Sequence, residues 1–255
     1  MEAERTLRTE SKTFFVRLAE RNIEIHPLYD EILAVCREYI CPNYTQPDLA
    51  VAVTDEDLTR EKAYALEQKQ KTGERVPYSL PYLETLVIYR KIASAMLAFN
   101  TFLMHGAVIS TEGEGYMICA PSGTGKSTRT RLWMEEIPDS VVVNGDKPLL
   151  RVTEEEVIAY GTPWCGKEGW NTNTSVPLRA IFLLERGENE VKELNFADVF
   201  PVLLRQTFKP QVPNGKLETM RLLTKMADKV RVYRFRSEPS MEAVRMAWEA
   251  AREKP

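Results

Sequence analysis

The chain has few of the residues that bind metal ions and almost no excess charge. Its 255 residues include two histidines and four cysteines, with no C-x-x-C pair, so a closed zinc site is not expected. Lys and Arg number 34 against 37 Asp and Glu, and this net charge of −3 gives no bulk attraction to nucleic acid. Without a disulfide framework, we expect free thiols in a reducing cytoplasm.

Long uninterrupted apolar runs are also absent. The most apolar segment, residues 92–109, is interrupted by Asn100, Thr101 and His105, which indicates a buried helix running into a strand instead of a membrane span. The start, MEAERTLRTESK, is polar and unlike a signal peptide. No internal repeat, low-complexity segment or N-K-x-D base-reading motif occurs. We therefore expect a cytoplasmic protein that binds neither nucleic acid nor membrane.

Apolar periodicity predicts an α/β fold with two regions. Residues 12–25 favour strands, 26–40 a helix, and 47–71 a strand followed by a helix with Thr54 as its N-cap. The Gly- and Pro-containing loop at 72–81 is the expected boundary, which gives an α+β region at 1–75 and a nucleotide-binding domain at 76–255.

Strands and helices alternate in the larger region, which favours a sheet covered by helices. A long apolar helix is expected at 82–104. Further strands are expected at 140–143, 148–152, 156–160, 178–185 and 230–235, and helices at 126–137, 196–206, 215–229 and 240–252.

The segment HGAVISTEGEGYMICAP predicts a β-hairpin, because two short apolar strands flank the turn sequence TEGEG. A hairpin at this place makes the sheet mixed instead of purely parallel. It also brings His105, at the start of the first strand, close to Ala120 at the end of the second. His105 is therefore a candidate site residue, although a lone histidine is more often structural.

The most specific motif is ICAPSGTGKSTRTRLW at 118–133, which matches the phosphate-loop (Walker A) pattern G-x-x-x-x-G-K-[ST] with Ala120 in place of the first glycine. Glycines let the backbone approach phosphates, and amides at a helix N-terminus attract anions. Lys126 supplies a charge for the β and γ phosphates, and the Ser127 hydroxyl is a ligand for Mg²⁺. The alternative is a Gly-rich turn without a ligand. The predicted nucleotide-binding residues are Ser122, Gly123, Thr124, Gly125, Lys126, Ser127 and Thr128.

A second candidate, Asp146, ends the predicted strand in SVVVNGDKPLL. One helix and one turn fit between it and Lys126, so both belong at the carboxyl edge of the sheet, where α/β proteins bind ligands. Asp146 is suited to hold Mg²⁺ through water or to accept a proton from a substrate hydroxyl. A simple N-G-D turn is the other interpretation, and the two are compatible.

Taken together, HGAVI, GYMICAPSGTGKST and VVVNGDKP resemble the HPr kinase and phosphoenolpyruvate carboxykinase superfamily of phosphate-loop proteins over residues 103–185. The resemblance implies a mixed sheet with ATP and Mg²⁺ on the loop, and an acidic pair after the next strand. It supports His105 as a site residue and Asp146 as metal ligand or base. This chain departs from the pattern at Gly145, where the first acid of the pair would stand. We expect restoring an acid by Gly145→Asp to leave or raise activity.

The Gly-rich loop within residues 160–187 is a further candidate and also looks like HPr-kinase-like bacterial proteins. Its Lys167 is able to offset transition-state charge if the loop closes over substrate. A surface loop with a packed Trp164 is the alternative.

The first functional hypothesis is a kinase that transfers the γ-phosphate of ATP to a hydroxyl of a peptide, protein or small molecule. The others are a carboxykinase-like small-molecule enzyme and a nucleotide-sensing module with little turnover. The resemblance leaves the phosphate acceptor open.

Overall fold

A computed structural model describes residues 13–42, 46–72 and 79–252 and divides into two compact units, Met1–Ala95 and Met96–Pro255. The predicted boundary loop is only partly described, since residues 73–78 lie outside the described ranges. The units divide after Ala95 because helix α4 (Leu80–Ala95) packs against other elements of the N-terminal unit. Within the described ranges, no helix is both long and apolar enough to cross a membrane.

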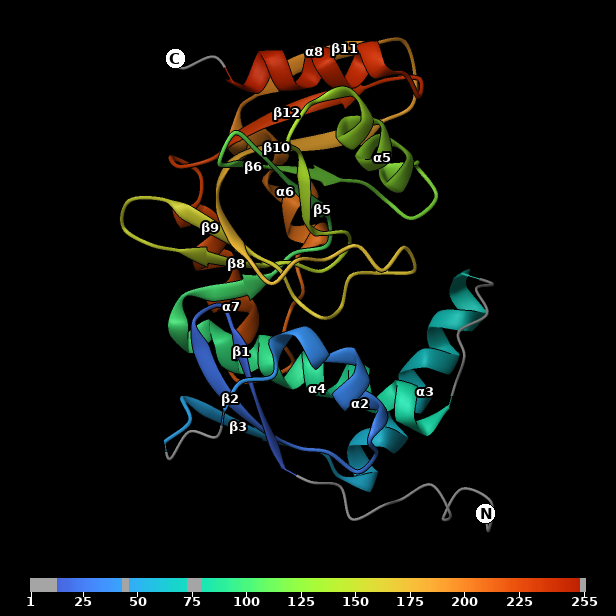
Figure 1. Ribbon diagram of the computed structural model, residues 1–255, viewed down its shortest axis with the longest axis vertical. Helices are drawn as coiled ribbons and strands as arrows, with labels where there is room; N and C mark the ends of the chain where they lie inside the picture. Colours follow the sequence, from blue (N-terminus) through green and yellow to red (C-terminus); the bar gives the residue numbers. More distant parts are fainter. Residues whose placement is uncertain (1–12, 43–45, 73–78, 253–255) are drawn as a thin grey trace. The chain divides into compact units, whose positions relative to one another are not determined.

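The N-terminal unit is α+β, as predicted (Figure 1). Strand β2 (Arg21–His26) pairs antiparallel with β1 (Phe14–Leu18) and parallel with β3 (Leu49–Ala52). Helix α3 (Asp55–Thr72) follows, and its first turn is capped as expected, since the Asp57 amide donates to Thr54 Oγ1 at 3.3 Å.

The helix expected at 26–40 is shorter than predicted and consists of α2 (Glu31–Val35) and the 3₁₀ turn η1 (Arg37–Tyr39). The amides of Leu28 and Tyr29 donate to the buried carboxylate of Glu84 on α4. These contacts attach the segment before α2 to α4.

The C-terminal unit contains a mixed sheet that is nine-stranded over the described residues. The order is β4-β8-β9-β10-β6-β5-β7, and β10 also pairs with β12, which pairs with β11. The strands are β4 (Thr101–Leu103), β5 (Ala107–Thr111), β6 (Glu114–Cys119), β7 (Val141–Asn144), β8 (Leu149–Val152), β9 (Val157–Tyr160), β10 (Ser175–Glu185), β11 (Glu190–Leu194) and β12 (Arg231–Arg236). The mixed α/β class is therefore confirmed.

The predicted hairpin is formed by β5 and β6, which pair from Thr111–Glu114 to Ala107–Ile118. Glu112 and Gly113 make the two-residue turn with positive φ angles of 53° and 79°, the conformation that matches strand twist in tight hairpins. Strands β10 and β12 run parallel to β6 and to each other in this sheet.

The prediction of a single long helix at 82–104 is wrong in its extent. Helix α4 ends at Ala95, the 3₁₀ turn η2 (Met96–Phe99) follows, and β4 begins at Thr101. Asn100 takes a left-handed φ of 51°, which reverses the chain and permits the strand. Strand β11 was also missed, because its side chains are polar and largely exposed and show no clean alternation.

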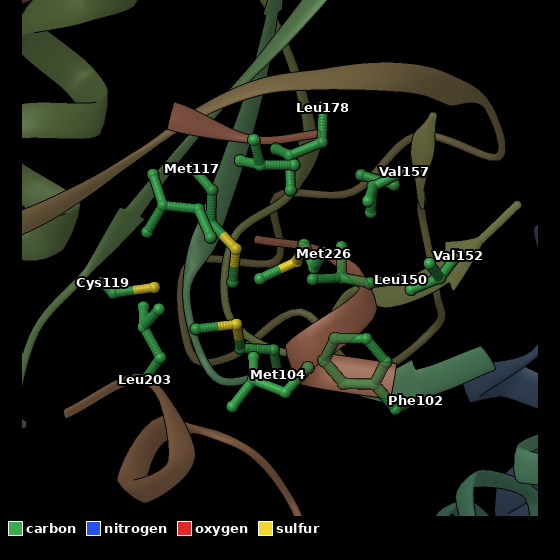
Figure 2. Packing of buried hydrophobic residues seen from close by; sticks show 14 of the residues in the cluster. Phe102, Met104, Met117, Cys119, Leu150, Val152, Val157, Leu178, Leu203 and Met226 are labelled. Carbon is green, nitrogen blue, oxygen red and sulfur yellow. The ribbon is translucent and has the colours of Figure 1, made fainter. Parts of the chain in front are cut away.

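Helices cover both faces of this sheet. Helices α6 (Phe196–Gln206) and α7 (Gly215–Lys225) pack on one face over an aliphatic and Met-rich cluster that includes Met104, Met117 and Met226 (Figure 2). Helices α5 (Lys126–Glu136) and α8 (Met241–Arg252) cover the other face.

That second core is aromatic. Trp133 of α5 is fully buried, with ring centroids 5.3 Å from Tyr116 and 5.8 Å from Phe182, and its indole N–H donates to Thr111 Oγ1 at 3.1 Å. This packing fixes the helix that follows the predicted phosphate loop to the sheet that precedes it.

We expect Trp133→Ala to lower the free energy of unfolding by about 3–5 kcal/mol, because it leaves a large cavity between α5 and the sheet. Trp133→Phe should cost less, since the ring contacts are kept and the hydrogen bond to Thr111 is lost. Urea unfolding followed by circular dichroism measures both. A Trp133→Ala protein as stable as the wild type would contradict this packing.

Candidate functional site

The predicted phosphate loop leaves β6 and enters α5, as the sequence pattern requires. Gly123 and Gly125 have φ angles of 77° and 105°, a left-handed region that favours glycine, and α5 begins at Lys126. Ala120 is only 2% exposed and packs into the aromatic core. Its small side chain therefore suits the point where the loop leaves the strand.

Three strand ends bring the candidate residues to one edge of the sheet. Because β5 is antiparallel to both β6 and β7, its start lies beside the carboxyl ends of those strands. His105 precedes β5, and Asp146 follows β7. The amide of Gly106 donates to the Asp146 carbonyl at 2.9 Å, which fixes these two chain segments together.

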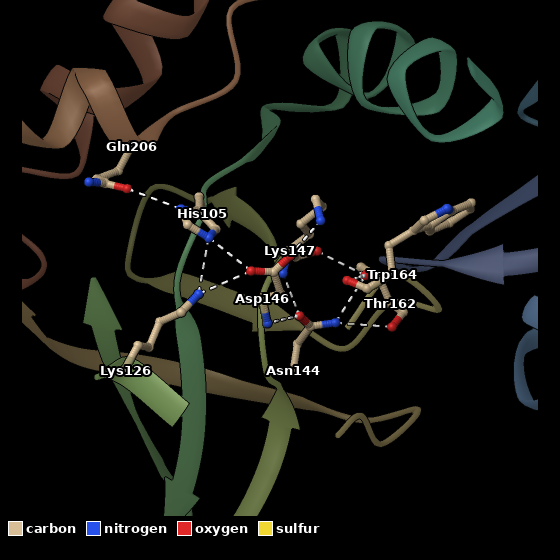
Figure 3. A network of polar contacts seen from close by, with 8 residues as sticks. All are labelled: His105, Lys126, Asn144, Asp146, Lys147, Thr162, Trp164 and Gln206. Carbon is tan, nitrogen blue, oxygen red and sulfur yellow. Dashed lines mark hydrogen bonds and ion pairs between the residues drawn. The ribbon is translucent and has the colours of Figure 1, made fainter. Parts of the chain in front are cut away.

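Asp146 is the centre of a polar cluster (Figure 3). Its Oδ1 lies 2.8 Å from His105 Nε2 and 3.1 Å from Lys126 Nζ, while Lys147 Nζ donates to Oδ2. Lys126 Nζ is also 3.1 Å from His105 Nε2. The structure therefore brings together Lys126, His105 and Asp146, three of the four residues predicted to act in catalysis.

The histidine is oriented from both sides of its ring. A carboxylate only accepts, so we assign the Nε2 proton as the donor to Asp146. On the other side, Nδ1 is 3.3 Å from the side-chain oxygen Oε1 of Gln206 at the end of α6, and the His105 backbone amide donates to the Gln206 backbone carbonyl at 2.7 Å. The sequence analysis missed Gln206, since a glutamine 101 residues away from His105 carries no local signal.

Asn144 holds the backbone of Asp146 and Lys147 in place, and the sequence analysis also missed this residue. Its side chain is fully buried, and Oδ1 accepts from the amides of Asp146 at 2.9 Å and Lys147 at 2.6 Å. Its Nδ2 donates to the carbonyl and the hydroxyl of Thr162, each at 3.0 Å. The N-G-D segment is therefore both a turn and part of the cluster, as the sequence allowed.

Charge compensation dominates at Asp146. Burial raises the pKa of this carboxyl, but the hydrogen bond from His105 and the charges of Lys147 and Lys126 outweigh it and hold the pKa well below its usual range. Asp146 is therefore ionised at neutral pH.

Magnesium binding at Asp146 stays a prediction: in this arrangement both carboxylate oxygens accept from cationic or N–H groups, so the ion would bind through water or displace a donor. The described residues contain no group of three His, Cys, Asp or Glu side chains able to hold a metal ion. Ser127 lies at the start of α5, where its hydroxyl is suited to a cation carried by phosphates.

Gly145 leaves little room for the side chain of a second acid. Its amide donates to the Trp170 carbonyl at 2.8 Å, and a Cβ there would lie 3.0 Å from the Cys165 carbonyl oxygen. Glycine at this position is explained by the close approach of the neighbouring loop.

That neighbouring loop, residues 161–174, runs along β7 and against Asp146. Thr172 donates to the Val143 carbonyl at 3.1 Å, and a Cβ at Gly166 would lie 3.1 Å from Asp146 Cβ. Trp164 is buried, as the packed-loop alternative expected. Lys167 is exposed and, within the described residues, takes no part in the cluster around Asp146.

A cavity of about 800 Å³ lies on the other side of the predicted phosphate loop. Leu183, Leu194, Val199 and Val202 form part of its apolar wall. Its polar residues are Ser122, Thr124, Glu185, Arg186, Arg205, Gln206 and Arg234. Through Gln206 the cavity adjoins the His105 side of the cluster.

No family model and no curated protein matches the chain. Among solved structures, the HPr(Ser) kinase/phosphatase from Coxiella burnetii is similar at a TM-score of 0.35 and 10% identity, over 59% of this chain and 88% of that chain. This is a distant fold similarity.

We expect Gly145→Ala to destabilise the C-terminal unit and Gly145→Asp to do so more strongly. The added atoms would push the 161–174 loop away from Asp146, and overpacking of this kind costs about 1–3 kcal/mol. Thermal unfolding of both variants checks this, with Gly113→Ala in the exposed hairpin turn as a strained but uncrowded control. A Gly145→Asp protein that is less stable and less active than the wild type would contradict the sequence-based expectation that this change leaves or raises activity. Unchanged stability would contradict the crowding described here.

We also expect a pH-dependent loss of stability in Asp146→Asn. The native carboxyl has a lowered pKa, so its stabilisation is present above the unfolded value of about 4 and is lost as pH falls through the native pKa. At pH 7 the variant should be about 1–3 kcal/mol less stable, because its cations lose their partner. This difference should shrink below about pH 4. Urea titrations at several pH values measure it, and a constant difference would contradict the assignment.

Proposed function

We propose that the chain is a nucleotide-binding phosphotransferase with a phosphate-loop core of the HPr kinase and phosphoenolpyruvate carboxykinase type, which passes the γ-phosphate of ATP to a hydroxyl. One observation carries the proposal: the lysine of the predicted phosphate loop meets a buried carboxylate and a histidine at the same sheet edge. The acceptor is a peptide, a protein or a small molecule.

The cluster supports a proton-transfer role for Asp146. In the described arrangement, Lys126 is paired with Asp146. A triphosphate on the loop competes for this ammonium group, and Asp146 then loses one of the charges that lower its pKa. The carboxylate becomes a better acceptor for a hydroxyl proton as the nucleotide binds, and His105 holds it in orientation.

The cavity beside the loop suits the nucleoside. Lys126 reaches toward β5 and β7, so phosphoryl transfer belongs on that side of the loop. The cavity opens on the β10 and β12 side and has the size of a small-molecule site. In this proposal ATP extends from the cavity to Lys126, and the acceptor approaches from the side of the 161–174 loop.

Magnesium enters the proposal with the nucleotide. It would neutralise phosphate charge, and Ser127 is the residue at the start of α5 suited to hold it. The chain's own contribution is fixed positive charge and positioning.

A second candidate function is nucleotide sensing without turnover. It is favoured by Gly145, where a second acid is absent and its side chain would be crowded, and by the fully paired carboxylate of Asp146. The two functions differ in whether phosphate leaves the nucleotide.

Nucleotide binding is tested by thermal unfolding with MgATP. At a ligand concentration 100 times the Kd, the wild type should gain about 2.7 kcal/mol of stability, and Lys126→Ala should gain none. Lys192→Ala is the matched control, since this exposed lysine of β11 lies outside the cluster and does not line the cavity. Equal stabilisation of the wild type and Lys126→Ala would sink the phosphate-loop assignment.

Turnover is tested with γ-labelled ATP and Mg²⁺, with and without cell extract. Transfer of label to an extract protein or metabolite, lost in Asp146→Asn, supports the kinase. Binding without transfer or hydrolysis supports the sensor.

A further inference from the structure

Arg129 is a buried positive charge that the proposed reaction does not use. It lies in the first turn of α5, directly after the predicted phosphate loop, and is only 3% exposed. Its Nη2 donates to the Ser237 carbonyl at 2.5 Å, and its Nε is 3.3 Å from Ser237 Oγ. These partners are neutral, so they satisfy hydrogen bonds without balancing the charge.

No carboxylate of the described residues lies within ion-pair distance of Arg129. Burial lowers the pKa of its guanidinium, the more distant charge of Glu238 raises it, and Arg186 lowers it further. A buried charge without a counter-charge is costly. A cation in the first turn also faces the positive end of the helix dipole, and this turn contains no acidic residue.

The guanidinium is aimed at the loop. A Cβ added at Gly125 would clash with Nη1 of Arg129. Nε and Nη2 are bonded to Ser237, whereas Nη1 makes no hydrogen bond to another described residue. A second arginine contacts the loop, since Arg186 Nη2 donates to the Gly123 carbonyl at 2.6 Å. Lys126 is a third cation of this segment.

From this arrangement we propose that Arg129 is a phosphate-binding residue, and that the missing counter-charge is a ligand with at least two linked phosphates held on the 122–128 loop. Nη1 contacts the phosphate from below the loop, while Ser237 keeps the guanidinium in place. A pyrophosphate group carries more negative charge than a single carboxylate and has several oxygens, so that in this proposal it interacts with Lys126 and Arg129 together. The proposal rests on the proposed nucleotide site and adds a residue outside the motif.

The test compares pyrophosphate and MgATP binding by calorimetry for the wild type, Arg129→Gln and Arg129→Met. Gln keeps a donor for the Ser237 carbonyl without the charge, and Met keeps volume alone. Circular dichroism shows which variants are folded, and one folded variant is sufficient to test whether Arg129 binds phosphate. We expect affinity for both ligands to fall by about 10- to 100-fold, as for loss of a hydrogen bond to a charged group.

Arg131→Met is the matched control, because Arg131 is on the same helix but exposed, with its guanidinium 5.7 Å from the Trp170 ring centroid. It should bind both ligands like the wild type. If the folded Arg129 variants bind as tightly as the wild type, Arg129 only anchors Ser237 and this inference fails while the proposed function stands. If the wild type binds neither ligand, both fail.

Discussion

The ionised carboxylate of Asp146 is the constraint on which the site depends. The Asp146 side chain is only 18% exposed, so its charge needs hydrogen-bond donors within the protein. These are supplied by His105, Lys126 and Lys147. Each donor comes from a different element, so satisfying this one charge fixes the start of β5, the start of α5 and the end of β7 relative to one another. The same need explains why the surrounding backbone is so closely tied by Asn144.

Charge is distributed unevenly around the predicted phosphate loop. On one side, Lys126 has a counter-charge within the protein. Below the loop, Arg129 has only neutral partners. An anion bound on the loop would supply a counter-charge to Arg129 and would compete with Asp146 for Lys126. Anion binding at the loop would therefore be coupled to the electrostatic environment of Asp146. This coupling gives both the kinase and the sensor interpretation a physical basis.

Local signals in the sequence were sufficient for the motif residues and for most elements. Strand alternation and the TEGEG turn placed the hairpin, and the strand–loop–helix order placed Lys126 and Asp146 at one edge. Long-range contacts were not predictable in the same way. Gln206, Ser237 and Thr162 join the site only because the sheet brings distant segments together.

Gly145 is another position where the sequence does not reveal a long-range contact. Its sequence context suggested a missing acid, and only the packed carbonyl of Cys165 reveals a steric reason for glycine. The chain reversal at Asn100 was hidden for a related reason, since a left-handed residue inside an apolar run has no strong sequence signature.

Strand β10 has a consequence for how the C-terminal unit holds together. Its first residues pair antiparallel with β9, and its later residues pair parallel with β6 from Leu178 and with β12 from Ala180. Without β10, the sheet order would separate into three pieces: β4-β8-β9, β6-β5-β7 and β11-β12. The pieces that carry Lys126 and Ser237 would then have no common strand between them. The sheet therefore favours cooperative, all-or-none assembly, in which Arg129 meets Ser237 only when the central strand is in place.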